Sequence, residues 1–596
     1  MKPSVSLLLA SALAGAVPLA AVPATPRAAA EQEADARFAD LSKRYIDGIA
    51  RLNPSYATGL GDHRFDDQVT DMSAEGRARS NAFDRAMLAE LGAIDRSRLS
   101  RDNQVDAALL ENALRYALWS DETLRNWAWD PQIYTDTAGT SLYSLAARDF
   151  APWDVRLKAA TARMEALPEL LAQARASLVP ERVPPIYATT VAKQNAGLVS
   201  IAEEALVPHR DALSPEDARR FDAALAGLKT AVAEHQKWLD EELVPKAKGE
   251  FRLGPELYDT KLRFALLSPL DRDEIKRRAL EALEETRAEM YALSREALKG
   301  RAGAPPTPDK PTPAEQQAAI EAALELSYAR RPTRDTLMAR AAETLEQATA
   351  FARKADFVTM PESPIRIIPT PEFQRGVAVA YCDSPGPLDR HLETFYMVSP
   401  LPDQWTGEQV ESYLREYNDY MIHDLSIHEA MPGHYLQLEH ANHNPSLLRA
   451  VLGSGTFIEG WAVYAERLMA EAGYLDGDAL FRLTVLKMRL RSIVNSLLDI
   501  GIHTEGMTRE QAMELMTRTA FQQESEASGK WVRASLGSTQ LPSYFVGYTE
   551  HMALRAEAER RLGNRFDLKA HNDRVLGYGS PPVRFVRALM FDEPIR

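Results

Sequence analysis

The sequence predicts a mainly α-helical protein, with one large helical body and a small β-sheet beside its functional site. Most of the chain places apolar residues three and four positions apart, the spacing of amphipathic helices. Pro and Gly fall mainly between these stretches, as expected for connections. The clearest predicted helices cover residues 102–118, 155–177, 215–242 and 272–298.

Two regions depart from the helical pattern. Residues 301–313 (RAGAPPTPDKPTP) form an exposed loop, because each Pro removes a backbone donor and restrains its neighbour. Three short segments rich in β-branched and aromatic residues and bounded by Pro and Gly predict strands. They are PIRIIP (364–369), GVAVAYC (376–382) and ETFYMV (393–398), after which the helical pattern returns.

Composition excludes some partners. The chain has 596 residues, of which 45% are apolar, enough for a large buried core. Its net charge of −15 argues against binding nucleic acid or an anionic membrane, because such surfaces need excess Lys and Arg. Composition predicts neither a substrate nor an oligomeric state.

The first 30 residues are typical of a secretory signal peptide. A basic start at Lys2 precedes an apolar and small-residue run over 5–22, and Ala28 to Ala30 offer a small-x-small cleavage site. Cleavage is expected after Ala30, or after Ala24. The mature protein is then periplasmic or secreted, without stable membrane insertion. The alternative is an uncleaved membrane anchor. A lipid anchor is not expected, because no Cys lies near the cleavage region.

The single cysteine, Cys382, limits the chemistry. One thiol cannot form an internal disulfide, and it excludes a cysteine-rich zinc site. We expect a buried and inert thiol, with a Cys nucleophile as the alternative.

The segment HEAMPGH (428–434) carries the strongest chemical signal. Imidazoles such as those of His428 and His434 are good zinc ligands, and the neighbouring Glu429 can take a proton from metal-bound water. The usual spacing of two such His is four residues, whereas here it is six, a rotation of about 240° on an ideal helix. A bulge at Met431-Pro432-Gly433 would return His434 to the metal-facing side. The alternative is a helix that ends at Pro432, with His434 a cap or surface residue.

A third ligand is expected from the helix GTFIEGWAVYAERLMAEA (455–472). Glu459 has apolar neighbours, among which a bare carboxylate is costly and a metal would offset that cost. Glu466 is expected either behind the ligands or in a salt bridge. Asp424, one turn before His428, either holds the imidazole N–H or is a surface charge. The remaining nearby histidines are expected at the surface or in packing: His423, His440 and His443.

The motifs HEAMPGHYLQ (428–437) and FIEGWAVYAE (457–466) resemble the bacterial family known as domain of unknown function 885. The likeness extends to residues 499–513 and 541–582. That family is grouped with the gluzincin zinc peptidases, so the resemblance implies a gluzincin-like fold and a Glu ligand on a later helix. The six-residue spacing is the family's own form of the motif.

Further site residues follow from the same resemblance. Tyr544 matches a family tyrosine and is the first candidate to stabilise the oxyanion, with Tyr548 second. His503 and His571 are candidate donors to substrate, with a structural role as the alternative for each. The segment 393–398 is expected to be an edge strand that pairs with an extended peptide, so that Tyr396→Pro would cripple binding.

We therefore expect residues 31–355 to form an N-terminal helical region and 356–596 a catalytic region. Zinc is held by His428, His434 and Glu459 with water as the fourth ligand, and Glu429 is the catalytic base. The expected reaction is peptide hydrolysis. The alternatives are a zinc hydrolase of another amide or ester, and a catalytically inactive peptide-binding protein.

Overall fold

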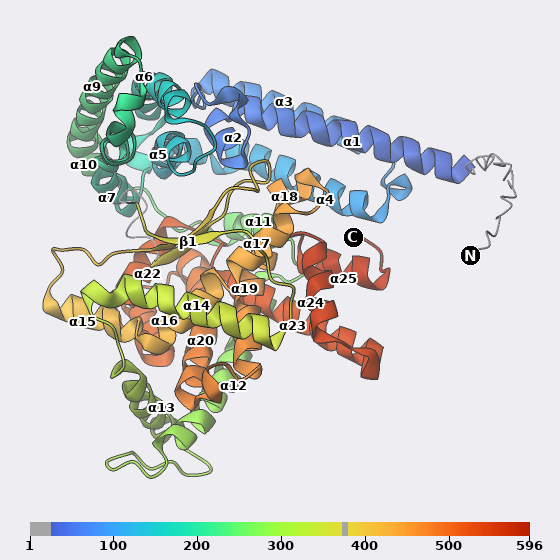
Figure 1. The fold of residues 1–596 in the computed structure, drawn as a ribbon, viewed down its shortest axis with the longest axis vertical. Helices are drawn as coiled ribbons and strands as arrows, with labels where there is room; N and C mark the ends of the chain where they lie inside the picture. Colours follow the sequence, from blue (N-terminus) through green and yellow to red (C-terminus); the bar gives the residue numbers. More distant parts are fainter. Residues whose placement is uncertain (1–25, 372–378, 596) are drawn as a thin grey trace, which may run out of the picture.

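The computed structural model describes residues 26–371 and 379–595, and helices dominate this part of the chain (Figure 1). The predicted mainly helical class is confirmed. In Figure 1 the blue to teal helices α1 to α10 form one group, and the green to red helices α11 to α25 form another. The sheet lies where the two groups meet.

The first group comprises α1 (Pro26–Leu52), α2 (Pro54–Leu60), α3 (Ala74–Gly92), α4 (Arg101–Trp119), α5 (Gln132–Ala146), α6 (Trp153–Ser177), α7 (Pro185–Gln194), α8 (Gly197–Ile201), α9 (Pro215–Trp238) and α10 (Val244–Lys246). Its apolar faces close around leucine- and alanine-rich cores, chiefly between α5, α6 and α9. Local signals set the ends: α9 begins where Ser214 accepts a hydrogen bond from the Asp217 N–H, and Pro215 occupies the first turn.

The second group comprises α11 (Gly254–Leu266), α12 (Arg272–Leu298), α13 (Pro313–Tyr328), α14 (Leu337–Ala355), α15 (Gly407–Glu416), α16 (Asp419–Glu429), α17 (His434–Asn442), α18 (Leu447–Val451), α19 (Gly455–Glu471), α20 (Ala479–Glu505), α21 (Arg509–Glu514), α22 (Glu524–Leu536), α23 (Pro542–Leu562), α24 (Leu568–Gly577) and α25 (Val583–Phe591). Helix α12 packs along α20, and α14 packs along α16. Packing therefore crosses the region boundary predicted near residue 356.

The sheet has three strands in the order β1 (Ile365–Pro369), β3 (Thr394–Val398), β2 (Ala380–Asp383). Strand β3 runs parallel to β1 and antiparallel to β2, with Cys382 opposite Tyr396. The expectation that 393–398 is an edge strand is wrong, because both sides of β3 are already paired. Strand β2 lies at the edge of the sheet as described. Residues 376–378 of the predicted second strand fall outside the described residues.

Two further expectations concern the loop and the N-terminus. The predicted loop 301–313 is confirmed: α12 ends at Leu298, and α13 begins at Pro313 behind a capping box formed by Thr312 and Glu315. Most of the predicted signal peptide, residues 1–25, lies outside the described residues. No helix in the described chain is long and apolar enough to cross a membrane.

Candidate metal centre

The first ligand candidate stands at the end of a buried helix. Helix α16 begins where Asn418 accepts hydrogen bonds from the N–H groups of Tyr420 and Met421, and it ends at Glu429. His428 lies in its last turn and is 6% exposed. The helix therefore brings this imidazole into the interior rather than to the surface.

The Pro-Gly segment breaks the helix instead of bulging it. Helix α17 starts with His434 as its first residue, after a cis Met431-Pro432 peptide bond. A Cβ on Gly433 would lie 2.0 Å from the carbonyl oxygen of His428, so only glycine permits this close return of the chain. The expected bulge within one helix is thus replaced by a break. His434 is nevertheless buried and faces His428, with ring centroids 4.7 Å apart.

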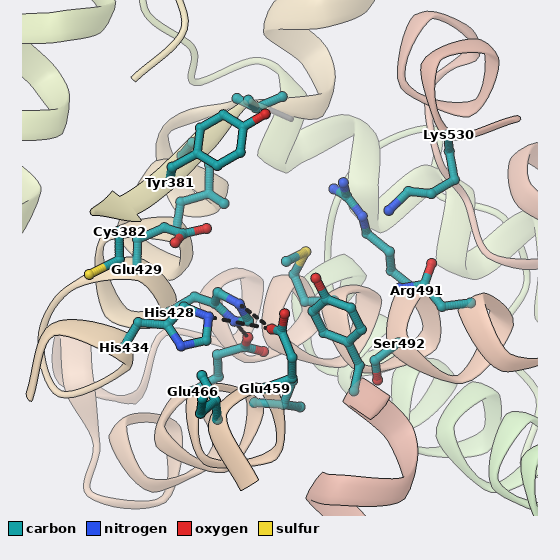
Figure 2. Close-up of a pocket in the computed structure, with 18 of the residues that line it drawn as sticks. Tyr381, Cys382, His428, Glu429, His434, Glu459, Glu466, Arg491, Ser492 and Lys530 are labelled. Carbon is teal, nitrogen blue, oxygen red and sulfur yellow. Dashed lines mark hydrogen bonds and ion pairs between the residues drawn. The ribbon is translucent and has the colours of Figure 1, made fainter. Parts of the chain in front are cut away.

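Glu459 on α19 meets the two imidazoles (Figure 2). Its Oε2 lies 3.8 Å from His428 Nε2 and 3.4 Å from His434 Nε2. One ligand atom from each residue lies within 4.8 Å of the others. The Trp461 indole N–H donates to the Pro432 carbonyl at 3.0 Å, which fastens α19 to the helix break.

The chemistry of these donors fits a metal. The Glu459 Oε2 is buried and accepts no hydrogen bond. Burial lowers the pKa of His428 to about 3, so this ring is neutral, as a ligand must be. Burial also opposes protonation of His434, but the neighbouring Glu459 and Glu429 raise its pKa overall, so metal binding would displace a proton from this ring. Burial opposes ionisation of Glu459, but the neighbouring His434 and His428 hold its pKa below the usual value. Two imidazoles and one carboxylate are a donor set of catalytic zinc sites that keep a fourth position open.

Glu466 orients the first candidate ligand, His428. Its Oε1 lies 2.6 Å from His428 Nδ1, so the Nδ1–H is held and Nε2 faces the metal position. The alternative of a position behind the ligands is confirmed, since Arg467 pairs with Glu471 instead.

Asp424 does not hold the imidazole N–H as one alternative had it. Both of its carboxyl oxygens are buried without a hydrogen bond, so it is not a surface charge either. The reason is that α19 presents Glu466 to the Nδ1 side of the ring. Burial raises the pKa of Asp424 to about 8, and burial together with Asp424 raises the pKa of Glu466 well above its usual value.

Glu429 lines the same cavity, which has a volume of about 350 Å³. Burial raises the pKa of its carboxyl group, and the backbone N–H of Cys382 partly offsets this by donating to it. Cys382 also lines the cavity. Cys382 is half-buried, not buried as expected, and desolvation together with the nearby Glu429 raises the pKa of its thiol well above the usual value.

Tyr544 reaches the cavity from α23. Its ring stacks on His428 at 6.3 Å, and its hydroxyl accepts a hydrogen bond from Arg533 Nη2 at 3.0 Å. Helices α19 and α23 approach to backbone contact at Gly460 and Gly547, where a Cβ on Gly460 would lie 2.3 Å from the Gly547 carbonyl carbon. Tyr548 is not among the cavity residues; its ring lies under Arg489.

His503 and His571 do not line the cavity. His503 Nε2 donates to the carbonyl oxygens of Ala534 at 2.9 Å and Gly537 at 2.8 Å, and Asp499 Oδ1 is 4.0 Å away. His571 is buried on α24 beside Phe566.

The other histidines pack as expected. His423 lies between the Tyr474 hydroxyl and Arg340, while His440 contacts the Thr359 carbonyl and His443 the Glu439 carbonyl.

Sequence reasoning missed a basic side of this cavity, formed by Arg491, Lys530 and Arg533. The available signal was the spacing of Lys530 and Arg533, three residues apart and so on one face of a helix. Arg491 comes from a different helix, α20, and has no such signal.

Comparison with known proteins gives a family without an activity. The sequence profile described as "Bacterial protein of unknown function (DUF885)" matches residues 54–590. A solved "putative lipoprotein of unknown function" from Shewanella oneidensis is 33% identical, with a TM-score of 0.77 over 93% of this chain and 99% of that one. A "putative lipoprotein" from Colwellia psychrerythraea is 18% identical, with a TM-score of 0.75 over 94% and 98%, and shows the fold alone. No curated protein matches the chain.

Proposed function

The chain belongs to the bacterial DUF885 family, and from that premise we propose that it is an exported zinc-dependent hydrolase that cleaves peptide bonds. One observation carries the proposal: His428, His434 and Glu459 offer three ligand atoms within 4.8 Å of one another. The donor set, two His and a Glu on a later helix, is also the basis for proposing a gluzincin-like centre.

The remaining roles belong to cavity residues. Zinc, when bound, would supply a Lewis acid and lower the pKa of a coordinated water. The Glu429 carboxylate would accept a proton from the attacking water and return it to the leaving amine. The Tyr544 hydroxyl, anchored by Arg533, would donate to the oxyanion. Glu466 would keep His428 in one tautomer and orientation.

Glu429→Gln tests the enzyme proposal. The amide keeps the size of the side chain but cannot accept the proton, so we expect kcat to fall about 10²- to 10⁴-fold. Mass-spectrometric product analysis on a peptide library measures the loss, and metal content of the same sample shows whether zinc is retained. Glu408→Gln, an exposed change at the start of α15, is the matched control and should behave as wild type.

Three results would contradict this function or redirect it. Activity unaffected by chelation, in protein that holds no zinc, would remove the metallohydrolase proposal. Hydrolysis of esters or other amides but not peptides would select the second class of substrate. Zinc and peptide binding without any hydrolysis would favour a binding protein.

A further inference from the structure

Three basic side chains form one side of the cavity, and we call Arg491, Lys530 and Arg533 the basic wall. Arg491 comes from α20, whereas Lys530 and Arg533 come from α22. Figure 2 places Arg491 and Lys530 across the cavity from Glu429 and Tyr381, with the His428 and His434 rings below Glu429. The wall is therefore in the same cavity as the metal ligands and takes no part in holding the metal.

The basic wall carries more positive than negative charge. Arg491 forms an ion pair with Glu526, whose other oxygen accepts from the Tyr417 hydroxyl at 2.5 Å. Lys530 is 5% exposed and forms no hydrogen bond in the described chain; its nearest carboxylate is the same Glu526, 3.9 Å away. Three basic groups thus share one carboxylate.

Arg533 adds to the imbalance. Its guanidinium donates hydrogen bonds to the neutral Tyr544 hydroxyl and to the Gln540 amide oxygen at 3.2 Å, and no carboxylate among the described residues lies in hydrogen-bonding range. The carboxylate that interacts electrostatically with Arg533 is that of Glu459, and a bound metal would neutralise its charge. Arg533 is half-buried, and a charge partly removed from water without an opposite charge beside it is costly, so an anion from outside the chain would complete the wall.

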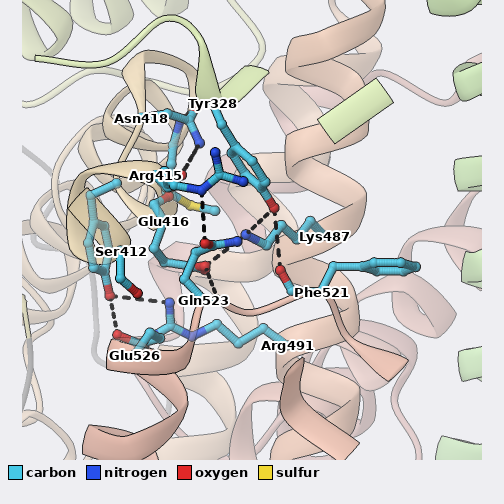
Figure 3. Close-up of polar contacts among 12 residues, drawn as sticks. Tyr328, Ser412, Arg415, Glu416, Asn418, Lys487, Arg491, Phe521, Gln523 and Glu526 are labelled. Carbon is cyan, nitrogen blue, oxygen red and sulfur yellow. Dashed lines mark hydrogen bonds and ion pairs between the residues drawn. The ribbon is translucent and has the colours of Figure 1, made fainter. Parts of the chain in front are cut away.

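A second layer of ion pairs fixes the wall in place (Figure 3). Behind Arg491 and Glu526, the Lys487 ammonium donates to Glu416 Oε2 at 2.8 Å. The same Glu416 oxygen accepts the Gln523 backbone N–H at 2.8 Å. Both carboxylate oxygens of Glu526 already accept hydrogen bonds, one from Arg491 and one from Tyr417. Glu526 therefore cannot form a direct ion pair with Lys530 without losing one of them.

We propose that the basic wall binds a carboxylate of the substrate, so that the enzyme acts on peptides with a carboxylate next to the bond that is cleaved. This inference rests on the proposed function. Guanidinium and ammonium groups are the usual partners of carboxylates, and Arg can bind both oxygens. The carboxylate is either the C-terminus of the peptide or an Asp or Glu side chain, two sources with the same chemistry.

The ionisation of Lys530 agrees with this role. Burial, together with Arg491 and Arg533, holds the pKa of Lys530 well below its usual value. An anion bound among the three groups would raise that pKa again, so substrate binding would charge the wall fully.

The experiment compares two matched pairs of peptides on the zinc-loaded full-length protein. One pair ends in a free carboxylate or a carboxamide, and the other carries Asp or Asn beside the scissile bond. We expect kcat/KM to be higher for the acid of one pair by about 10- to 100-fold, the value of a charged hydrogen bond. Lys530→Met should remove most of that preference, because the acidic peptide loses an ion pair that the neutral peptide never makes. Lys276→Met, which breaks an exposed pair with Glu505, carries the same charge change outside the cavity and should keep the preference.

Preference for the free C-terminus assigns the wall to a terminal carboxylate, and preference for Asp assigns it to a side chain. Equal cleavage within both pairs overturns the inference and leaves the proposed function standing. A second result would also overturn the inference: equal cleavage within both pairs, together with an activity that requires chloride in wild type but not in Lys530→Met. The wall would then bind an inorganic anion. The proposed function can also fail while the inference stands, and calorimetry on Glu429→Gln detects this case. If acetyl-phenylalanine binds more tightly than its amide, while the wild-type protein cleaves no peptide, the wall binds carboxylates and the peptidase function fails.

Discussion

Two buried polar clusters lie close together in this protein and differ in how their charges are satisfied. In the ion-pair cluster, Lys487 and Glu416 are 2% and 0% exposed, and the ammonium donates directly to Glu416 Oε2, so the two charges are paired even though Glu416 Oε1 has no hydrogen bond. In the metal cluster, Glu459 Oε2 is buried without a hydrogen bond and lies 3.4 Å from His434 Nε2 and 3.8 Å from His428 Nε2. A buried cluster whose charges already match has a structural explanation, whereas one in which three ligand atoms converge around an unbonded carboxylate oxygen calls for a cation.

Breaking the ion-pair cluster should have the largest effect on stability. Lys487→Met leaves Glu416 buried with only a backbone donor, so we expect a loss of about 3–5 kcal/mol in the free energy of unfolding. Denaturant unfolding followed by circular dichroism measures this loss. The exposed control Lys276→Met should cost less than about 1 kcal/mol.

A double variant sharpens the same prediction. Changing Glu416 to Leu together with Lys487→Met removes both charges, and such replacements of buried pairs are often neutral or stabilising. Recovery of stability in the double variant would show that the cluster is self-contained. An equal loss in the single variant and the exposed control would contradict the assignment.

The metal cluster should respond in metal affinity rather than in folding. Glu466→Gln weakens the acceptor that holds His428 Nδ1–H, and we expect zinc affinity to fall about 10- to 100-fold, as for comparable partners of ligand imidazoles. Competition with a chromophoric chelator gives the affinity. Glu471→Gln, on the same helix but paired with Arg467 and Arg555, is the control. Unchanged zinc affinity in Glu466→Gln would mean that the hydrogen bond from His428 Nδ1–H to Glu466 does not orient the His428 ring for metal binding.

The sequence allowed the candidate ligand residues, which the structure brings together, to be named because their types and order are local features. His428, Glu429 and His434 stand within seven residues, and Glu459 lies in a helix whose apolar neighbours make a bare carboxylate costly. The helices, the Pro-rich loop and the three strands follow for the same reason. Each is decided within a short window of residues.

What failed depends on contacts between distant segments. A bulge and a helix break both suit Met431-Pro432-Gly433, and the choice is made where α17 and Trp461 pack. Asp424 is the visible neighbour of His428 in sequence, but Glu466 reaches the ring from another helix. Strand β3 is central because β1 and β2 flank it, and its residues are buried along the whole strand, as in a central strand.

The smallest expected effect is on the pH dependence of stability, and it tests whether Asp424, beside the metal cluster, can be negatively charged in the folded protein. Burial raises the pKa of Asp424 to about 8, whereas in the unfolded chain the group ionises near its ordinary value of 3.8. A raised folded-state pKa contributes stability that is fully present below the unfolded pKa and is lost as pH rises through the folded one. In zinc-free protein we therefore expect stability to fall between about pH 4 and pH 8, and Asp424→Asn to flatten that fall by about 1 kcal/mol or more.

Thermal unfolding across this pH range, with chelator present, measures the difference between wild type and Asp424→Asn. Asp592→Asn, whose side chain is 95% exposed, should leave the pH profile unchanged. A profile for Asp424→Asn that is as steep as that of wild type would mean that the carboxyl is ionised in the folded protein. A cation or a hydrogen-bond donor would then have to lie beside the Asp424 carboxylate. The metal cluster would in that case contain a positive group that its described contacts do not include. The contrast with the Glu416–Lys487 pair would weaken accordingly, because both clusters would then satisfy their carboxylates from within.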